Sequence, residues 1–265
     1  MEDYKLIFLN ENNIDTEHIC CAIGNDKVNK ERAEVKKAWL REEFKKGHCF
    51  LKVDVRGKVF IEYCPAESAW FPITATGFHF IQCLWASGKY KGQGLGKKLL
   101  TACEEDCRMK KSSGLVAITN NKKAPYTVDK KFFLKQGFKK VDEAPPYFEL
   151  YVKKFDITAP DPVFKKNTPT KQLKNSKGVL IYYSDMCPFN APFVKIMAKT
   201  AEQRGLKAEI RKIKNAEEAQ SLPTAWGNCS VYLDGNFVSH MAMTEKMFNA
   251  LLDEKLEEKN KEILG

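Results

Sequence analysis

A loop rich in glycine and lysine limits the fold more than any other part of the sequence. It reads Lys89-Tyr-Lys-Gly-Gln-Gly-Leu-Gly-Lys-Lys98, between an apolar segment at 77–84 and an amphipathic one at 94–111. That context predicts a turn from a strand into a helix. Glycine at three alternate positions allows a tight turn that points several N–H groups into one concavity. Because the helix adds the positive end of its dipole, the loop predicts a diphosphate site.

Other phosphate-binding loops match this sequence less well. A dinucleotide fingerprint belongs to an early βαβ unit, whereas this loop follows two expected helices and three expected strands. A Walker loop ends in Gly-Lys-Ser/Thr, and Gly96-Lys97-Lys98 lacks the hydroxyl that holds magnesium. The remaining alternative is a glycine-rich turn that binds no ligand.

The chain has 265 residues, which is long for one domain and sufficient for two. The clearest change in composition covers 156–177, where Pro160, Pro162 and Pro169 interrupt a lysine-rich stretch with little hydrophobic periodicity. We therefore expect one domain at 1–155, a linker at 156–177 and a second domain at 178–265.

Hydrophobic periodicity predicts a mixed sheet flanked by helices in the first domain. The expected helices cover 13–23, 29–46, 94–111 and 130–136, and the expected strands cover 49–54, 58–63, 77–84, 115–119 and 147–153. In the second domain we expect the order β, α, β, α, β, β, α, with strands at 178–183, 207–213, 229–233 and 237–239 and helices at 189–204, 215–221 and from 244 onward.

Charge and cysteine content narrow the partners and the compartment. The net charge of +10 favours anionic partners, but the lysines mostly lie beside acidic residues, so a nucleic-acid partner is the least favoured. No apolar run approaches the roughly 20 residues of a membrane span, so we expect no membrane partner. The nine cysteines lack zinc-type spacing and an export signal is not evident, which favours a reducing cytoplasm. The oligomeric state stays open.

Two motifs identify a family resemblance. Lys91-Gly-Gln-Gly-Leu-Gly96 resembles the coenzyme A-binding motif of the GNAT-type N-acetyltransferases, and Phe132-Phe-Leu-Lys-Gln-Gly-Phe138 resembles their later signature. The resemblance covers about 1–155. The whole chain is similar to YoaP-type bacterial acetyltransferases, which pair this domain with a small thioredoxin-like one. The fold class implied is α/β (an α+β mixed sheet), a GNAT acyltransferase fold followed by a thioredoxin-like domain.

The resemblance implies acetyl-coenzyme A as co-substrate and an unidentified small-molecule amine as acceptor. The amine would attack the acetyl group directly, without a covalent enzyme intermediate and without a metal. The diphosphate would be held by the loop, and the pantetheine arm and acetyl carbonyl would lie along the preceding strand end. The residues expected at the diphosphate are Lys91, Gly92, Gln93, Gly94, Leu95, Gly96 and Lys97. Those expected beside the pantetheine arm and the acetyl carbonyl are Cys83, Leu84 and Trp85.

The catalytic acid and base are less clear from sequence. Many relatives carry a tyrosine four residues before the Gly-Phe pair, but here that position is Phe133, which cannot donate a proton. Tyr126 is the tyrosine nearest in sequence. Glu62 and His79 are candidate general bases by residue type, although each could also serve the fold alone.

The second domain places Cys187 at a strand-to-helix junction, the position of the attacking thiol in thioredoxins, where a helix N-terminus lowers a cysteine pKa. The usual partner cysteine, three residues on, is Asn190. Cys229 is expected near Cys187, so the two could form a disulfide or bind a soft metal. The alternative function is thus a thiol-dependent redox or metal-binding protein whose GNAT domain senses coenzyme A. A module used only for packing or acceptor choice also stays open.

Overall fold

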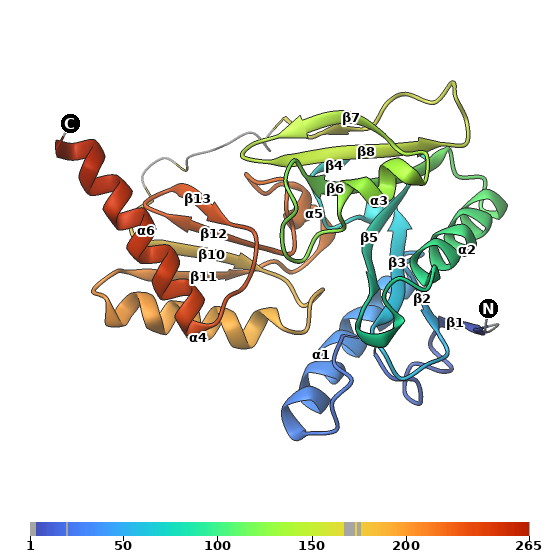
Figure 1. The fold of residues 1–265 in the computed structure, drawn as a ribbon, viewed down its shortest axis with the longest axis horizontal. Coiled ribbons are helices and arrows are strands. Elements are labelled where there is room, and N and C mark those ends of the chain that lie inside the picture. Colours follow the sequence, from blue (N-terminus) through green and yellow to red (C-terminus); the bar gives the residue numbers. More distant parts are fainter. Residues whose placement is uncertain (1–3, 20, 167–172, 174–175, 265) are drawn as a thin grey trace.

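The computed structural model describes residues 4–19, 21–166, 173 and 176–264. These residues form two main sheets, one in an N-terminal part (residues 4–166) and one in a C-terminal part (residues 176–264) that lie side by side (Figure 1). The mixed α/β class expected from sequence is confirmed.

The N-terminal sheet has seven strands in the order β1-β2-β3-β5-β6-β8-β7. Its strands are β1 (Leu6–Leu9), β2 (Cys49–Val53), β3 (Val59–Pro65), β5 (His79–Ala86), β6 (Gly114–Asn120), β7 (Lys139–Ala144) and β8 (Phe148–Lys154). All neighbouring strands are antiparallel except β5 and β6, which are parallel. One additional small sheet pairs β4 (Ile73–Thr74) with β9 (Val163–Phe164).

Helices cover both faces of this sheet (Figure 1). On one face, α2 (Leu95–Met109) and α3 (Lys130–Lys135) bury apolar side chains against the strands, and on the other face α1 (Lys27–Phe44) buries Trp39 and Leu40. Two 3-10 turns, η1 (Ala66–Ser68) and η2 (Gly88–Tyr90), complete the described helices of this part.

The helix expected at 13–23 is wrong; its described residues form hydrogen-bonded turns instead. Asn13 donates a side-chain hydrogen bond to the carbonyl of Phe8 (2.8 Å) and accepts one from the amide of Asn10 (2.9 Å). Asparagine side chains that bond nearby backbone groups in this way compete with helix formation. Position 20 of the expected helix lies outside the described residues.

Sequence analysis did not predict the edge strands β1 and β7. β1 has four residues, and β7 is mostly polar, Lys-Lys-Val-Asp-Glu-Ala, so neither shows a clear strand period. The expected linker 156–177 contains β9, which pairs with β4 of the N-terminal part, while its residues 167–172 and 174–175 lie outside the described residues. The exact domain boundaries stay a prediction.

The C-terminal sheet has the order β11-β10-β12-β13. Its elements follow the expected sequence: β10 (Val179–Tyr183), α4 (Asn190–Gln203), β11 (Ala208–Lys212), α5 (Ala216–Gln220), β12 (Cys229–Leu233), β13 (Asn236–Ser239) and α6 (Glu245–Leu264). β10 and β11 are parallel, and the other pairs are antiparallel. The assignment of this part as thioredoxin-like stays a prediction.

The two parts share one hydrophobic core on the α1 side of the N-terminal sheet. This core includes Phe60, Phe71, Phe80 and Phe148 of the N-terminal part, and it continues into buried side chains of the C-terminal part: Met186, Ile213, Ala219, Leu222, Ala225 and Trp226. The approach is close at Gly227, where an added Cβ would lie 1.6 Å from the carbonyl oxygen of Trp70. The two parts therefore pack as one body.

Candidate active site

The glycine-rich loop lies before the N-terminus of α2, as the sequence predicts. Gly94 is the N-cap residue of α2, with φ 78°, and no side chain caps this end of the helix. Gly92 also has a positive φ of 82°, and a Cβ built at either glycine would meet nothing within 4 Å. Lys91, Gly92, Gln93 and Gly94 are exposed. The loop thus offers uncapped helix N–H groups and open space, which suits an anion.

Neighbouring side chains hold the loop in place. Gln93 donates to the carbonyl of Lys89 (2.7 Å) and accepts from the Tyr4 hydroxyl (3.3 Å). Leu95 is buried against the sheet, and a Cβ at Gly96 would touch the ring of Phe132 at 3.5 Å. Lys97 is exposed beside the loop. The second motif therefore packs directly behind the first.

β5 and β6 separate beyond a short parallel ladder. They pair only from His79 to Ile81 in the described register, while β5 continues to Ala86 and β6 to Asn120. A β-bulge marks the point of separation, because Glu62 of β3 pairs with Cys83 and Tyr63 pairs with Ile81, which leaves Gln82 as the extra residue. The gap contains a pocket of about 30 Å³, the strand cleft, lined by Ile81, Gln82, Cys83, Leu84, Trp85, Ile118, Tyr126, Thr127, Val128, Phe133 and Trp226.

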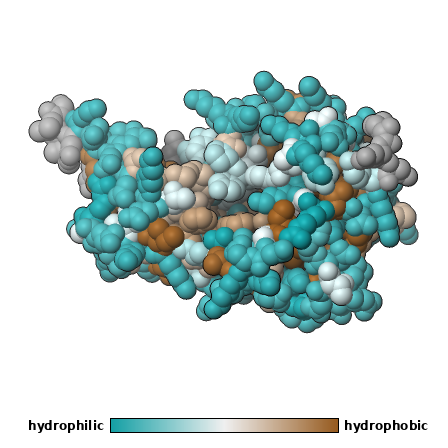
Figure 2. Space-filling view, turned by 60° about the horizontal axis from the view of Figure 1, so that its bottom comes forward, coloured by the Kyte–Doolittle hydropathy of each residue, from teal (hydrophilic) through white to brown (hydrophobic). Residues whose placement is uncertain are grey.

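A second pocket, the central cavity, lies between the two parts of the chain and has a volume of about 470 Å³. Figure 2 shows the surface hollowed between two lobes, with pale to tan surface inside and mainly teal around it. Aromatic and sulfur-containing side chains make up most of the lining, which consists of Cys21, Lys58, Phe60, Glu62, Phe71, Gln82, Cys83, Trp85, Pro125, Tyr126, Met186, Cys187, Phe189, Phe193, Trp226, Asn228 and Met247. The cavity and the strand cleft share five of these residues: Gln82, Cys83, Trp85, Tyr126 and Trp226.

Among the described residues that line the cavity, Glu62 is the only acidic one. It is 2% exposed, and its Oε2 atom lies 2.6 Å from Nζ of Lys36 and 3.2 Å from Nε2 of His48. Burial alone would raise the pKa of Glu62, but the Lys36 ammonium and the His48 hydrogen bond lower that pKa to below its ordinary value. The lowered pKa means that the carboxylate is ionised near neutral pH. The two contacts on Oε2 fix its orientation.

Tyr126 and His79 have different surroundings. Tyr126 lines both pockets, is 53% exposed and has a φ of 62°, and partial burial raises the pKa of its hydroxyl. His79 starts β5 on the α2 side, where its ring meets Tyr63 and its Nδ1 atom is buried without a hydrogen-bond partner. His79 is absent from the lining of both pockets, so the structure does not bring it together with Glu62.

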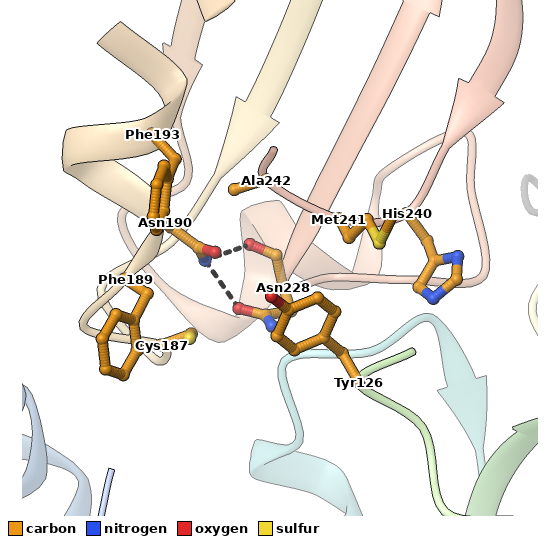
Figure 3. Close-up of a pocket in the computed structure, with 9 residues that line it drawn as sticks. All are labelled: Tyr126, Cys187, Phe189, Asn190, Phe193, Asn228, His240, Met241 and Ala242. Carbon is orange, nitrogen blue, oxygen red and sulfur yellow. Dashed lines mark hydrogen bonds between the residues drawn. The ribbon is translucent and has the colours of Figure 1, made fainter. Parts of the chain in front are cut away.

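Cys187 lines the central cavity and a smaller pocket beside it, together with Tyr126 and Asn228 (Figure 3). Asn190 stands where a dithiol motif would have its second cysteine, and its amide donates to Oδ1 of Asn228 (2.7 Å) and to the carbonyl of Ser184 (3.0 Å). Cys229 is buried in the core of the C-terminal part. Burial raises the pKa of both thiols, and neither is in a disulfide. A reactive thiolate is therefore disfavoured, and the thiol-dependent alternative gains no support.

Sequence reasoning missed Lys36, Gln82 and Trp226. Lys36 falls within a helix of alternating charges, Glu31 to Lys37, so nothing marks one lysine as buried. Gln82 is one polar residue in an apolar strand, and Trp226 lies outside the expected elements of the C-terminal part. Only the apolar residues next to Trp226 in the sequence could have indicated that its side chain is buried.

Comparison with known proteins identifies the class. Residues 15–138 match the model of the acetyltransferase (GNAT) family, and residues 208–249 match the YoaP-like family. The N-terminal part is thus the acyltransferase domain of a GNAT enzyme. A protein described as uncharacterized N-acetyltransferase YoaP, from Bacillus subtilis strain 168, is 38% identical over 247 residues, covering 93% of this chain and 98% of that protein. The chain therefore belongs to the YoaP N-acetyltransferases of the GNAT family.

Solved structures similar to this chain include two acetyltransferases. One is PaiA N-acetyltransferase from Thermoplasma acidophilum in complex with coenzyme A, with 18% identity, 57% coverage of this chain, 99% coverage of that chain and a TM-score of 0.41. Another is a GNAT family acetyltransferase from Brucella melitensis in complex with acetyl-CoA. Its identity is 17%, the match covers 63% of this chain and 98% of that chain, and the TM-score is 0.36.

Two further features are absent from the described residues. No helix within them is long and apolar enough to cross a membrane. No group of three or more histidine, cysteine or acidic side chains among them is placed to hold a metal ion.

Proposed function

We propose that this enzyme transfers the acetyl group of acetyl-coenzyme A to the amine of a small molecule bound in the central cavity. The observation that carries the proposal is the wall of five residues that the strand cleft and the central cavity share. A thioester in the cleft and an amine in the cavity would meet at this wall. Such proximity converts a bimolecular reaction into an effectively unimolecular one.

The donor site combines the loop and the cleft. Backbone N–H groups of Gln93 to Lys97 bind the diphosphate, and the exposed Lys91 and Lys97 add positive charge. The part of β5 that follows the bulge, residues 83–85, lies along the pantetheine arm and polarises the acetyl carbonyl through a backbone N–H group. The open space in front of Gly92 and Gly94 supports this assignment. Acetyl-coenzyme A supplies the acetyl group as a thioester.

Glu62 acts as the general base. An amine is mainly protonated near neutral pH and must lose a proton before its nitrogen can attack the carbonyl carbon. The ammonium first releases one proton to solvent, and the neutral nitrogen then adds to the carbonyl carbon. The second nitrogen proton of this tetrahedral adduct passes to the Glu62 carboxylate as the carbonyl re-forms and the C–S bond breaks. Glu62 is placed for this role because it is ionised, faces the cavity and is held by Lys36 and His48 on Oε2. Its lowered pKa makes it a weak base, so the proton that it accepts is the acidic one on the nitrogen of the adduct rather than that of the free ammonium.

Tyr126 acts as the acid that protonates the departing sulfur. It lines the junction of cleft and cavity and is 53% exposed. Its hydroxyl is protonated near neutral pH, because the ordinary tyrosine pKa of about 10 is raised further by partial burial. Phe133 also lines the strand cleft, at the sequence position where many relatives carry a tyrosine. A hydroxyl from Tyr126 would therefore replace one lost at position 133.

Two linked measurements test the proposed function. Calorimetric titration of acetyl-coenzyme A into the intact protein should show saturable 1:1 binding. Incubation with a panel of primary amines should release coenzyme A in step with an acetylated amine detected by mass spectrometry. Failure of the protein to bind acetyl-coenzyme A would overturn the proposal.

A further inference from the structure

His240 joins the C-terminal part of the chain to the loop that carries Tyr126. It directly follows β13, is 5% exposed and lines the smaller pocket together with Tyr126 (Figure 3). Its Nε2 atom lies 3.0 Å from the carbonyl oxygen of Pro125, and its Nδ1 atom lies 2.7 Å from the hydroxyl oxygen of Tyr147. Because a carbonyl oxygen can only accept, Nε2 carries the hydrogen and Nδ1 accepts from Tyr147.

The imidazole of His240 is held firmly in this orientation. Its ring meets the rings of Trp226, Tyr147 and Phe148 edge to face, with centroids 5.6, 5.5 and 5.9 Å away. Burial lowers the pKa of His240, so the imidazole is neutral near neutral pH and its Nδ1 atom is free to accept. The packing and the two hydrogen bonds together fix the direction of the N–H group toward Pro125.

This hydrogen bond acts on the backbone of Tyr126. Tyr126 has a left-handed φ of 62°, which is unfavourable for a residue with a Cβ atom. The Pro125 carbonyl belongs to the peptide plane that precedes Tyr126, and φ is the rotation between that plane and the rest of Tyr126. A hydrogen bond that fixes the carbonyl therefore holds this φ. On the other side of Tyr126, the Asn120 amide donates to the Thr127 hydroxyl (3.2 Å), which anchors the loop to β6.

A strained backbone at a functional residue persists only where its surroundings hold it. We propose that His240 is a positioning residue for acetyl transfer, which fixes the Pro125 carbonyl and so keeps the Tyr126 hydroxyl at the junction of cleft and cavity. Without this hydrogen bond Tyr126 would relax toward a negative φ, and its ring would turn away with the backbone. The C-terminal part thus completes the active site of the N-terminal part. This inference rests on the proposed function.

Two substitutions of His240 test the role of its N–H group. His240→Met removes the donor and fills the space with a flexible apolar side chain. We expect kcat to fall about tenfold and the KM for either substrate to stay within about twofold, because a proton donor to the leaving group acts only in the transition state. His240→Gln carries an amide N–H that can reach the same carbonyl, so it should restore most of the kcat. Coenzyme A release is followed with the fastest primary amine of the panel.

A double variant separates positioning from a general loss of packing. If His240 acts through the Tyr126 hydroxyl, His240→Met should lower kcat by less than about twofold in a Tyr126→Phe background. A loss of packing would lower kcat equally in both backgrounds. Tyr147→Phe removes only the hydroxyl that donates to Nδ1 of His240, and it serves as a second variant if circular dichroism shows that His240→Met does not fold. Its smaller loss of kcat should also disappear in the Tyr126→Phe background.

Tyr232→Phe is the matched control. The Tyr232 hydroxyl also donates to a proline carbonyl, that of Pro223 (3.2 Å), and Tyr232 is buried in the C-terminal sheet. It is absent from the described lining of the strand cleft, the central cavity and the smaller pocket. This variant should therefore retain the wild-type kcat.

Several results would overturn the inference while the proposed function survives. They are a wild-type kcat in His240→Met, an equal loss of kcat in both backgrounds, and a kcat in His240→Gln as low as in His240→Met. A wild-type kcat in Tyr126→Phe would also overturn it, because the Tyr126 hydroxyl would then have no role that needs positioning. If wild-type enzyme releases no coenzyme A with any amine, the proposed function and the inference fail together.

Discussion

Lys36 on α1 donates a hydrogen bond of 2.7 Å to the backbone carbonyl of Met186, 150 residues further along the chain. The same ammonium lies 2.6 Å from Glu62, and both side chains are at most 2% exposed. One buried cation therefore fixes both the carboxylate of the N-terminal part and the turn that leads to Cys187. The position of the proposed base and the shape of the cavity wall depend on each other through Lys36.

Replacing Lys36 by methionine should leave the buried Glu62 carboxylate without its cationic partner. We expect Lys36→Met to lower the free energy of unfolding by about 3–5 kcal/mol, the usual effect of removing one partner of a buried ion pair. The double variant Lys36→Met/Glu62→Met should be more stable than the single variant, because no charge is left unpaired. Urea unfolding at pH 7 measures both. A double variant as unstable as Lys36→Met would show that the loss comes from the Met186 hydrogen bond or from packing.

The same pair predicts a pH dependence of stability. The folded pKa of Glu62 is lowered, so its contribution is complete above the unfolded value of about 4.3 and is lost as pH falls through the lower folded value. The stability gap between wild type and the double variant should therefore stay constant from pH 7 to about pH 5. It should change in favour of the double variant at lower pH. His48, whose lowered pKa also depends on Glu62 and Lys36, is replaced by glutamine in both proteins. A gap that still changes between pH 7 and 5 would contradict a lowered pKa for Glu62.

Replacing Glu62 by glutamine should remove the proposed base. We expect Glu62→Gln to reduce kcat/KM by roughly 10²–10⁴-fold, the usual contribution of a general base, with affinity for coenzyme A unchanged. Glu149→Gln is the matched control, because Glu149 is also a buried strand carboxylate with lysine partners but does not line the cavity. Equal losses in both variants would indicate a structural role for Glu62.

The sequence predicted local features of this molecule well and distant contacts poorly. The loop before α2 was found because its glycines set a positive φ within one turn, which depends on neighbouring residues only. The helix expected at 13–23 failed because apolar spacing there competes with asparagine side chains that bond nearby backbone groups. The partnership of Glu62 with Lys36 crosses from a strand to a helix, and that of Lys36 with Met186 joins the two parts. No periodicity encodes such pairings.

A carboxylate in the loop should abolish donor binding. We expect Gly94→Glu to weaken acetyl-coenzyme A binding at least 100-fold by calorimetry, since the new side chain brings bulk and negative charge to the proposed diphosphate site. Gly205→Glu is matched for backbone strain, because Gly205 has φ 74° and open space like Gly94 (φ 78°) but lies after α4. Wild-type affinity in Gly94→Glu would place the diphosphate elsewhere.

A methyl group at Gly227 should disturb the contact between the two parts. Gly227→Ala would place Cβ against the Trp70 carbonyl, so we expect a loss of stability of about 1–3 kcal/mol from overpacking. The KM for the amine should rise as Trp226 shifts, while affinity for coenzyme A stays unchanged. Gly205→Ala, whose cost is backbone strain alone, should leave the KM unaltered. An unchanged KM for the amine in Gly227→Ala would show that the contact between Gly227 and Trp70 does not affect acceptor binding.

Removing the Tyr126 hydroxyl should slow the release of the thiol. We expect Tyr126→Phe to lower kcat by about 10–100-fold with little change in the KM for either substrate, because a proton donor to the leaving group acts only in the transition state. Tyr182→Phe is a suitable control, since its hydroxyl accepts from Arg211 on the C-terminal sheet and Tyr182 does not line the cavity. The rate is best followed as coenzyme A release at saturating amine. If Tyr126→Phe retains the wild-type kcat, either a different group protonates the sulfur or the thiolate leaves unassisted.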